Sequence, residues 1–184
     1  MQEESKIIER VLAGKTDEFA YFLDAYAERL HLWVLRLVSC EQDAEEVVQD
    51  AFVKAYTHLS DFNRYSAFST WLYRIAYNCA VQHLRRRQRE PLLTIDNEQL
   101  SSVTDTMADE SLAVDTEERI IALRKAIDLL TPDDRALITL FYYEGRSQAD
   151  IAYVLSIAEG AVATRLSRVR KRLSLLLKSI DYEN

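Results

Sequence analysis

The chain has 184 residues, enough for two small domains, and a formal net charge of −7. Only three glycines and two prolines occur, which leaves little of the turn chemistry that sheets and hairpins need, so we expect an all-α fold. No apolar run approaches the roughly 20 residues that span a bilayer, so we expect no membrane insertion.

The predicted helices of the first domain, residues 1–89, follow from apolar residues spaced three and four apart. They cover about residues 3–13, 17–38, 41–59 and 68–88. Residues 90–115 contain Pro91 and many Ser, Thr and Asp residues with weak periodicity. This composition predicts a flexible acidic linker.

The sequence thus predicts two small helical domains. The second covers residues 116–184, and its first helix covers about residues 117–130. Thr131 and Pro132 provide an N-cap and a proline at the first position of the next helix. Further on, a helix-turn-helix is predicted from a short helix, a tight turn and a long basic helix. Its expected apolar interior consists of Ile151, Ala152, Leu155, Val162 and Leu166.

The start of this helix-turn-helix is marked by Ser147 and Asp150, which match a capping box with aspartate in place of glutamate. The second helix begins at Glu159. An ordinary basic helical hairpin is the alternative, but the cap, the spacing and the charge together favour DNA binding.

Charge is segregated along the chain. Residues 64–89 hold six arginines and no acid, residues 90–118 hold nine acids and no base, and residues 146–178 hold seven basic and two acidic side chains. Phosphate attraction is local, because charges are screened beyond roughly 10 Å at moderate salt. Two basic segments therefore favour nucleic-acid binding despite the acidic total, although the arginines could instead form solvated helix faces.

One face of the helix over 68–88 combines an aromatic ring, amides and guanidinium groups. At 100° per residue, it is shared by Trp71, Arg74, Asn78, Gln82 and Arg85. The adjoining arc that should face the core consists of Leu72, Ile75, Ala76 and Cys79. Aromatic rings stack on unpaired bases and arginines hold a separated strand. A lone tryptophan is more often a core residue, but the combined face favours nucleic acid.

The cysteines and histidines favour neither a disulfide scaffold nor a metal site. Cys40 and Cys79 lie among apolar residues, which predicts two buried thiols. His31, His58 and His83 are far apart, and no phosphate loop or nucleophile motif is present. The acidic N-terminus lacks the order of a signal peptide. We expect a cytoplasmic protein that is not an enzyme and uses no metal or cofactor.

Three segments resemble the extracytoplasmic-function sigma factors of bacterial RNA polymerase. Residues 68–78, FSTWLYRIAYN, resemble the segment that melts the promoter and recognises its minus-ten element. Residues 43–56, DAEEVVQDAFVKAY, resemble the helix that binds core polymerase, and residues 130–132 with 145–172 resemble the domain that recognises the minus-thirty-five element. The three segments stand in the family's order and spacing.

The resemblance implies a non-catalytic subunit that binds core RNA polymerase and promoter DNA and is usually held inactive by an anti-sigma factor. The implied polymerase contacts are Glu46, Gln49, Asp50, Phe52 and Tyr56. The implied minus-ten residues, including a pocket for a flipped base in the loop before the fourth helix, are Asn63, Arg64, Ser66, Phe68, Ser69, Trp71, Arg74, Asn78, Gln82, Arg85 and Arg86. The implied minus-thirty-five residues are Ser147, Gln148, Glu159, Gly160, Ala161, Ala163, Thr164, Arg165 and Arg168.

The sequence departs from the family's pattern at two positions. Ala163 stands where the family often has a basic residue, and Ala158 where proline is common, so the minus-thirty-five preference is open. The acidic linker resembles a family segment that threads the polymerase channel, with a simple tether as the alternative.

Two other functions fit parts of the sequence. A dimeric repressor or activator would use only the helix-turn-helix and would bind a two-fold DNA site without polymerase. A nucleic-acid enzyme would need metal ligands or a nucleophile. The paired carboxylates around Glu46 suggest a di-metal site, but no Glu-x-x-His motif supports one.

Overall fold

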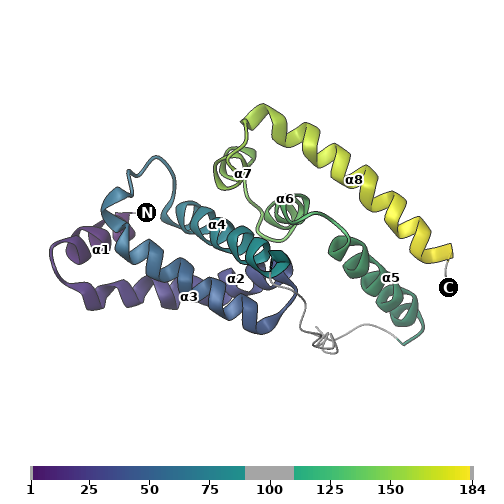
Figure 1. The fold of residues 1–184 in the computed structure, drawn as a ribbon, viewed down its shortest axis with the longest axis horizontal. Coiled ribbons are helices and arrows are strands. Elements are labelled where there is room, and N and C mark those ends of the chain that lie inside the picture. The colour runs from purple at the N-terminus through teal and green to yellow at the C-terminus, as the bar shows by residue number, and fades with distance from the viewer. Residues whose placement is uncertain (1, 90–109, 183–184) are drawn as a thin grey trace.

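The computed structural model describes residues 2–89 and 110–182, and all regular elements in these two ranges are helical (Figure 1). The N-terminal domain contains α1 (Gln2–Leu12), α2 (Ala20–Val38), α3 (Glu41–Thr57) and α4 (Phe68–Arg89), with short 3₁₀ helices η1 (Thr16–Phe19) and η2 (Leu59–Asp61). The C-terminal domain contains α5 (Glu110–Asp128), α6 (Pro132–Tyr142), α7 (Gln148–Leu155) and α8 (Glu159–Tyr182). The expected all-α fold is confirmed.

Two predicted helix starts are confirmed by their caps. The Thr131 hydroxyl accepts a hydrogen bond from the backbone N–H of Asp134 at 3.3 Å, and Pro132 occupies the first position of α6. The Ser147 hydroxyl accepts from the N–H of Asp150 at 3.1 Å and begins α7. Each cap satisfies a backbone donor that the first helical turn leaves unpaired.

The turn between α2 and α3 holds Ser39 and Cys40. Ser39 ends α2 in the left-handed conformation, with φ 57°, and its N–H donates to the Leu35 carbonyl at 2.8 Å. Cys40 is extended and only half-buried, whereas Cys79 is buried. The expectation of two buried thiols is therefore confirmed for Cys79 and wrong for Cys40, because this turn brings Cys40 towards the surface.

The core of the N-terminal domain is aromatic. Trp33 and Phe22 on α2 are fully buried, and the Phe22 ring stacks on that of Phe68 with centroids 4.0 Å apart. The Tyr73 ring lies 4.9 Å from that of Trp33. Large apolar rings bury much area in a small domain, and offset or tilted pairs add to that stabilisation.

The C-terminal domain packs around an aliphatic core. All five residues expected in the helix-turn-helix interior are buried, which confirms that prediction: Ile151, Ala152, Leu155, Val162 and Leu166. Helix α5 begins at Glu110, before the expected linker end at residue 115, and Leu and Ala in its first turns have high helix propensity. The rest of the linker that was predicted to be flexible, residues 90–109, lies outside the described ranges.

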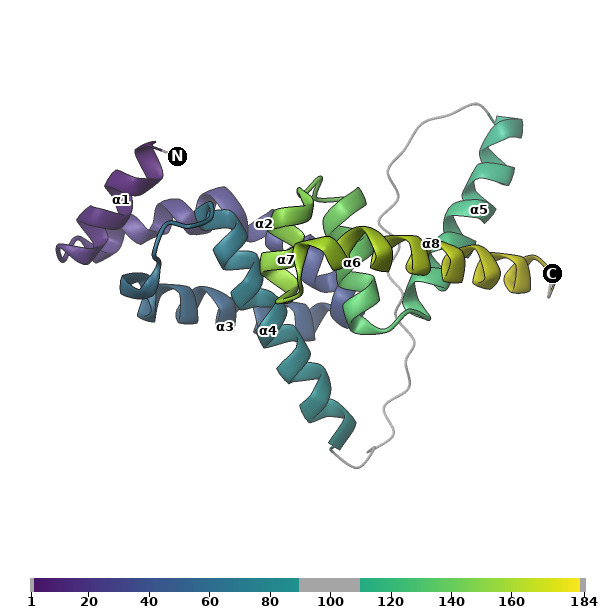
Figure 2. The same ribbon diagram turned by 90° about the horizontal axis from the view of Figure 1, so that it is seen from above.

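The two domains lie against each other. Helix α6 contacts α2, and α7 contacts α4. Figure 2 shows α7 beside the first half of α4, while the second half of α4 extends away from α7 and α8. Different parts of α4 therefore lie in the N-terminal core, at the domain contact and on the exposed surface.

None of the helices in residues 2–89 and 110–182 has the length and apolar character required to cross a membrane.

Candidate nucleic-acid and polymerase interfaces

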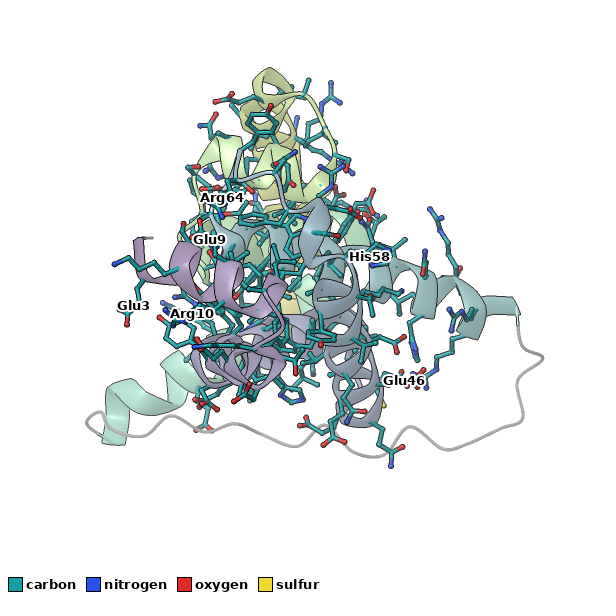
Figure 3. The ribbon with its side chains drawn as sticks, turned by 90° about the vertical axis from the view of Figure 1, so that its left-hand side faces the viewer. Glu3, Glu9, Arg10, Glu46, His58 and Arg64 are labelled. Atoms are coloured by element: carbon teal, nitrogen blue, oxygen red, sulfur yellow. The ribbon has the colours of Figure 1, made fainter. Side chains whose placement is uncertain are left out.

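Helix α3 presents acidic and amide groups on its outer side. The Glu46 side chain, labelled in Figure 3, is 60 % exposed and lies 3.8 Å from Nδ1 of His83 on α4. Gln49 and Asp50 are exposed on the same helix. These three residues can pair with basic or hydrogen-bonding groups of a partner.

The two apolar residues predicted to contact polymerase differ in position. Tyr56 is 40 % exposed, and its ring packs edge-on against Phe19 at 5.2 Å. Phe52 is 6 % exposed and lies in the core. Tyr56 can therefore anchor a partner directly, whereas Phe52 supports the helix from within.

The loop before α4 is shaped by local contacts. The Asn63 side-chain oxygen accepts from the Tyr65 N–H at 3.2 Å. Arg64 has φ 62° and donates to the Glu9 carboxylate on α1 at 3.0 Å; these two side chains are labelled side by side in Figure 3. The Ser66 hydroxyl is buried and has no hydrogen-bond partner among the described residues. Asn63 and Arg64 remain accessible to a ligand.

Phe68 and Trp71, two further predicted minus-ten residues, face inward. Phe68 is 2 % exposed, and Trp71 is 9 % exposed with its ring 5.2 Å from that of Phe62. Trp71 also lines a cavity described below. In this conformation Phe68 is a core residue, and Trp71 is a largely buried residue that forms part of the wall of that cavity.

Ser69 and Arg74 are engaged by the C-terminal domain. The Arg146 guanidinium donates to the Ser69 hydroxyl at 3.0 Å. The Arg74 guanidinium lies over the Tyr153 ring of α7, 4.6 Å from its centroid, which is cation–π geometry. Both residues were predicted to face DNA, and both lie at the domain contact.

A cavity of about 470 Å³ lies between the end of α3 and the middle of α4. Its lining residues are Lys54, His58, Asp61, Trp71, Ile75, Asn78, Cys79 and Gln82. Three of the predicted minus-ten residues thus converge on one cavity, with an aromatic edge, two amides and a cation. These groups can stack on a base, bond to its edge and attract its phosphate.

One wall of this cavity contains a lysine–cysteine pair. The Lys54 ammonium lies 3.3 Å from the Cys79 sulfur. Burial raises the pKa of the Cys79 thiol and outweighs the opposing effect of Lys54. The thiol therefore stays neutral at physiological pH.

The second half of α4 is basic and exposed. Arg85 and Arg86 are exposed, and Arg87 forms an ion pair with Asp43 of α3. In Figure 2 this part of the helix projects from the body of the molecule. Arg85 and Arg86 can therefore reach a nucleic-acid backbone without any rearrangement.

The tip of the helix-turn-helix is open. All but one of the predicted minus-thirty-five residues are exposed, namely Ser147, Gln148, Glu159, Gly160, Ala161, Ala163, Thr164 and Arg168. The exception is Arg165, which forms ion pairs with Asp133 at 3.3 Å and Asp134 at 3.4 Å. Small side chains at the start of α8 allow a close approach to a DNA groove.

Several residues at these interfaces were not predicted. Lys54 of α3, Asp61 of η2 and His58 between these two elements line the cavity, and Arg146 and Tyr153 cover part of α4. Arg146 begins the second basic segment, but its partner could not be inferred from that position. In residues 2–89 and 110–182, His, Cys, Asp and Glu side chains form no group of three that could hold a metal ion.

The fold and these surfaces are those of a two-domain, helix-turn-helix DNA-binding protein whose helix α3 exposes acidic and amide side chains. The Sigma-70 region 2 family matches residues 22–90, and the Sigma-70 region 4 family matches residues 120–173. The chain belongs to the extracytoplasmic-function sigma factors of RNA polymerase, which are non-catalytic specificity subunits.

Relatives of similar length support this assignment. The RNA polymerase sigma-H factor of Pseudomonas aeruginosa is 32 % identical over 97 % of this chain and 96 % of its own. The factor SigW of Bacillus subtilis is 31 % identical over 95 % and 97 %, and the sigma-E factor of Haemophilus influenzae is 35 % identical over 91 % of both chains.

Two solved structures share the fold, and both were determined as complexes. The sigma factor RpoE with the anti-sigma factor NepR from Bartonella quintana has a TM-score of 0.69 and 27 % identity, covering 88 % of this chain and 97 % of that one. CnrH with the cytosolic domain of CnrY has a TM-score of 0.66 and 25 % identity, covering 94 % and 96 %.

Proposed function

We propose that this sigma factor binds core RNA polymerase and directs initiation at promoters that it recognises through both domains. The observation that carries the proposal is the cavity between α3 and α4, where Trp71, Asn78 and Gln82 converge beside the exposed Arg85 and Arg86. An unstacked base fits an aromatic edge with amide donors and acceptors, and arginines hold the adjoining phosphates.

The other contacts follow from exposure and charge. Glu46, Gln49 and Asp50 dock on a basic surface of core polymerase, with Tyr56 as an apolar anchor. Duplex DNA at the minus-thirty-five element is contacted by the start of α8, and Arg168 binds a phosphate. An anti-sigma factor would act by covering these surfaces. Because core polymerase is cytoplasmic, the protein acts in the cytoplasm.

Transcription reconstituted with purified bacterial core polymerase on genomic promoter fragments tests this function. The protein is expected to bind core and to produce promoter-specific transcripts. Absence of both would refute the proposal.

Two pairs of variants separate the surfaces. Asp50→Lys should weaken core binding, whereas Glu45→Lys, an equal charge change on the same exposed helix about 140° away, should not. Gln82→Ala should impair open-complex formation with normal core binding, and Gln88→Ala on the exposed end of α4 is its control. Loss of core binding in Gln82→Ala would show that this part of α4 does not bind a base.

A further inference from the structure

The basic end of α4 has no anion within its own stretch of sequence. Four arginines stand within residues 85–89, and residues 64–89 contain no acid. Like charges this close on a helix repel one another, and the final carbonyls of a helix have no partner within it, so its last turn tends to fray. Residues 85–88 are exposed, and in Figure 2 this end of α4 projects from the body of the molecule. Its order therefore depends on contacts with another element.

That contact comes from the first turn of α3. The Asp43 carboxylate forms an ion pair with the Arg87 guanidinium through Oδ2, and Nε2 of His83 lies 3.2 Å from its Oδ1. Asp43 thus contacts two side chains that are about one turn apart on α4. The Asp43 side chain is 17 % exposed and that of His83 16 %, so neighbouring atoms shield the contact from water and salt.

Asp43 faces a different way from the other acids of its segment. It is the first residue of the segment 43–56, which resembles the polymerase-binding helix. The Glu46 side chain of that segment is 60 % exposed, and Asp50 is exposed as well. Asp43, in contrast, is already paired with α4 and largely shielded, so its carboxylate has little to offer a docking partner. The contacts of Asp43 assign it to α4 and not to the docking surface.

The side of α4 that Asp43 holds lies opposite the side that carries the candidate DNA contacts. At about 100° per residue, the two positions that Asp43 contacts are about 40° apart, and Arg85 lies about 160° from each of them. By the same count Arg85 is within about 20° of Asn78 and about 60° of Gln82, which line the cavity between α3 and α4. Arg85 therefore continues the line of the cavity only while the last turns of α4 stay helical.

We propose that Asp43 is a positioning residue for promoter DNA: through Arg87 it holds the last turns of α4 in helical form, and this keeps Arg85 in line with the base-binding cavity. The inference rests on the proposed function, because it presumes that Arg85 and the cavity bind promoter DNA. Asp43 acts through α4 without touching DNA itself. A carboxylate near DNA otherwise repels phosphate, so an effect through position and an effect through charge alone have opposite signs.

Asp43→Asn tests the proposal in the full chain bound to core polymerase. The probe is a genomic promoter fragment on which reconstituted transcription initiates. The amide keeps the size of the side chain but loses the ion pair with Arg87. Open complexes should form about threefold less, the size expected for a partly shielded ion pair, with core binding unchanged. Glu45→Gln, exposed on the same helix, is the matched control and should change neither quantity.

Two further measurements separate positioning from a general loss of stability. The effect of Asp43→Asn should largely vanish in an Arg85→Ala background and remain in full in an Arg168→Ala background, because Arg168 lies on α8. A merely structural effect would be equal in both backgrounds. Amide hydrogen exchange of residues 84–89, read by mass spectrometry, should be faster in Asp43→Asn, whereas that of residues 30–38 in α2 should not change.

Each outcome decides between these roles. Fewer open complexes that depend on Arg85, together with faster exchange at the end of α4, support the proposal. Unchanged or more numerous open complexes, an equal loss in both backgrounds, unchanged exchange, or a loss of core binding in Asp43→Asn would each overturn the positioning role and leave the proposed function intact. If Arg85→Ala alone leaves open-complex formation unchanged, the proposed DNA contact at the end of α4 fails, and the role of Asp43 fails with it.

Discussion

Helices α4 and α8 contain the two basic segments of the chain, but they differ in how much of their surface is buried. The first half of α4 is buried between α2, α3 and α7, with Thr70 and Tyr73 each at most 1 % exposed. Helix α8 buries one stripe and leaves its other sides open; that stripe consists of Val162, Leu166, Val169 and Leu173. We therefore expect a substitution early in α4 to alter folding and the domain contact, and one on the outer side of α8 to alter neither.

The largest expected difference between the two helices is in stability. Tyr73→Ala removes a buried ring packed on Trp33 and a hydroxyl bonded to Glu144, so the free energy of unfolding should fall by about 3–5 kcal/mol. Thr164→Ala, on the exposed tip of α8, should change it by less than about 0.5 kcal/mol. Urea denaturation measures both. Equal losses of unfolding free energy in the two variants would show that the two helices do not differ in their contribution to stability.

The reverse difference is expected in DNA affinity. Arg168→Ala removes an exposed cation of α8, which should weaken binding of minus-thirty-five duplex about tenfold and reduce the salt dependence by about one counterion, with unchanged stability. Titrations at several salt concentrations measure this. Lys178→Ala, the same charge change near the end of α8, is the control. An equal loss in both variants would show that charge alone, not the position of Arg168, determines affinity.

Alkaline pH should act on α4 rather than on α8. Burial, followed by a hydrogen bond to a carboxylate, raises the pKa of the Tyr73 hydroxyl, and the same two causes raise the pKa of Tyr77. The folded protein keeps these protons while the unfolded chain loses them near pH 10. Stability is thus full below about pH 10 and decreases above it, by at most about 1.4 kcal/mol per pH unit for each tyrosine. Urea denaturation of Tyr73→Phe between pH 9 and 11.5 should show a smaller decrease, and an unaltered pH dependence would contradict this assignment.

The last comparison concerns the thiols. Cys79 on the inner side of α4 is 4 % exposed with a raised pKa, whereas Cys40 is half-buried outside the helix. Iodoacetamide should therefore modify Cys40 at least about tenfold faster than Cys79 at pH 7.5, as mass spectrometry of digested protein can show. Comparable rates would mean that α4 separates from α3 readily.

The sequence predicted helices and caps well because their causes are local. Apolar spacing located α4, and the Thr131 and Ser147 side chains bond within their own first turns. The inward position of Phe68 and Phe52 could not be predicted from family resemblance, since a motif records residue types but not which side faces the core. Cys40 was misjudged because its apolar neighbours flank a turn.

The exposure of candidate site residues could be predicted from the sequence only where it follows from the periodicity of a single helix. Asn78, Gln82, Arg85 and Arg86 lie exposed on α4, as their spacing indicated. Glu144 gave no comparable indication: a lone acid after an apolar helix is usually exposed, and its partners are 71 and 115 residues away in the chain. Long-range polar contacts of this kind depend on how whole domains meet, which periodicity does not encode.

The pairing of α7 with α4 takes place within one polypeptide, so its strength depends on an effective concentration, not on how much protein is present. For domains joined by a short segment this is of order millimolar. A contact with a Kd of only about 1 µM between separate domains would then be closed roughly a thousand times more often than open. Cleavage of one peptide bond between α4 and α5 would remove this advantage and release both domains at cellular dilution, although every contact between them would remain chemically intact.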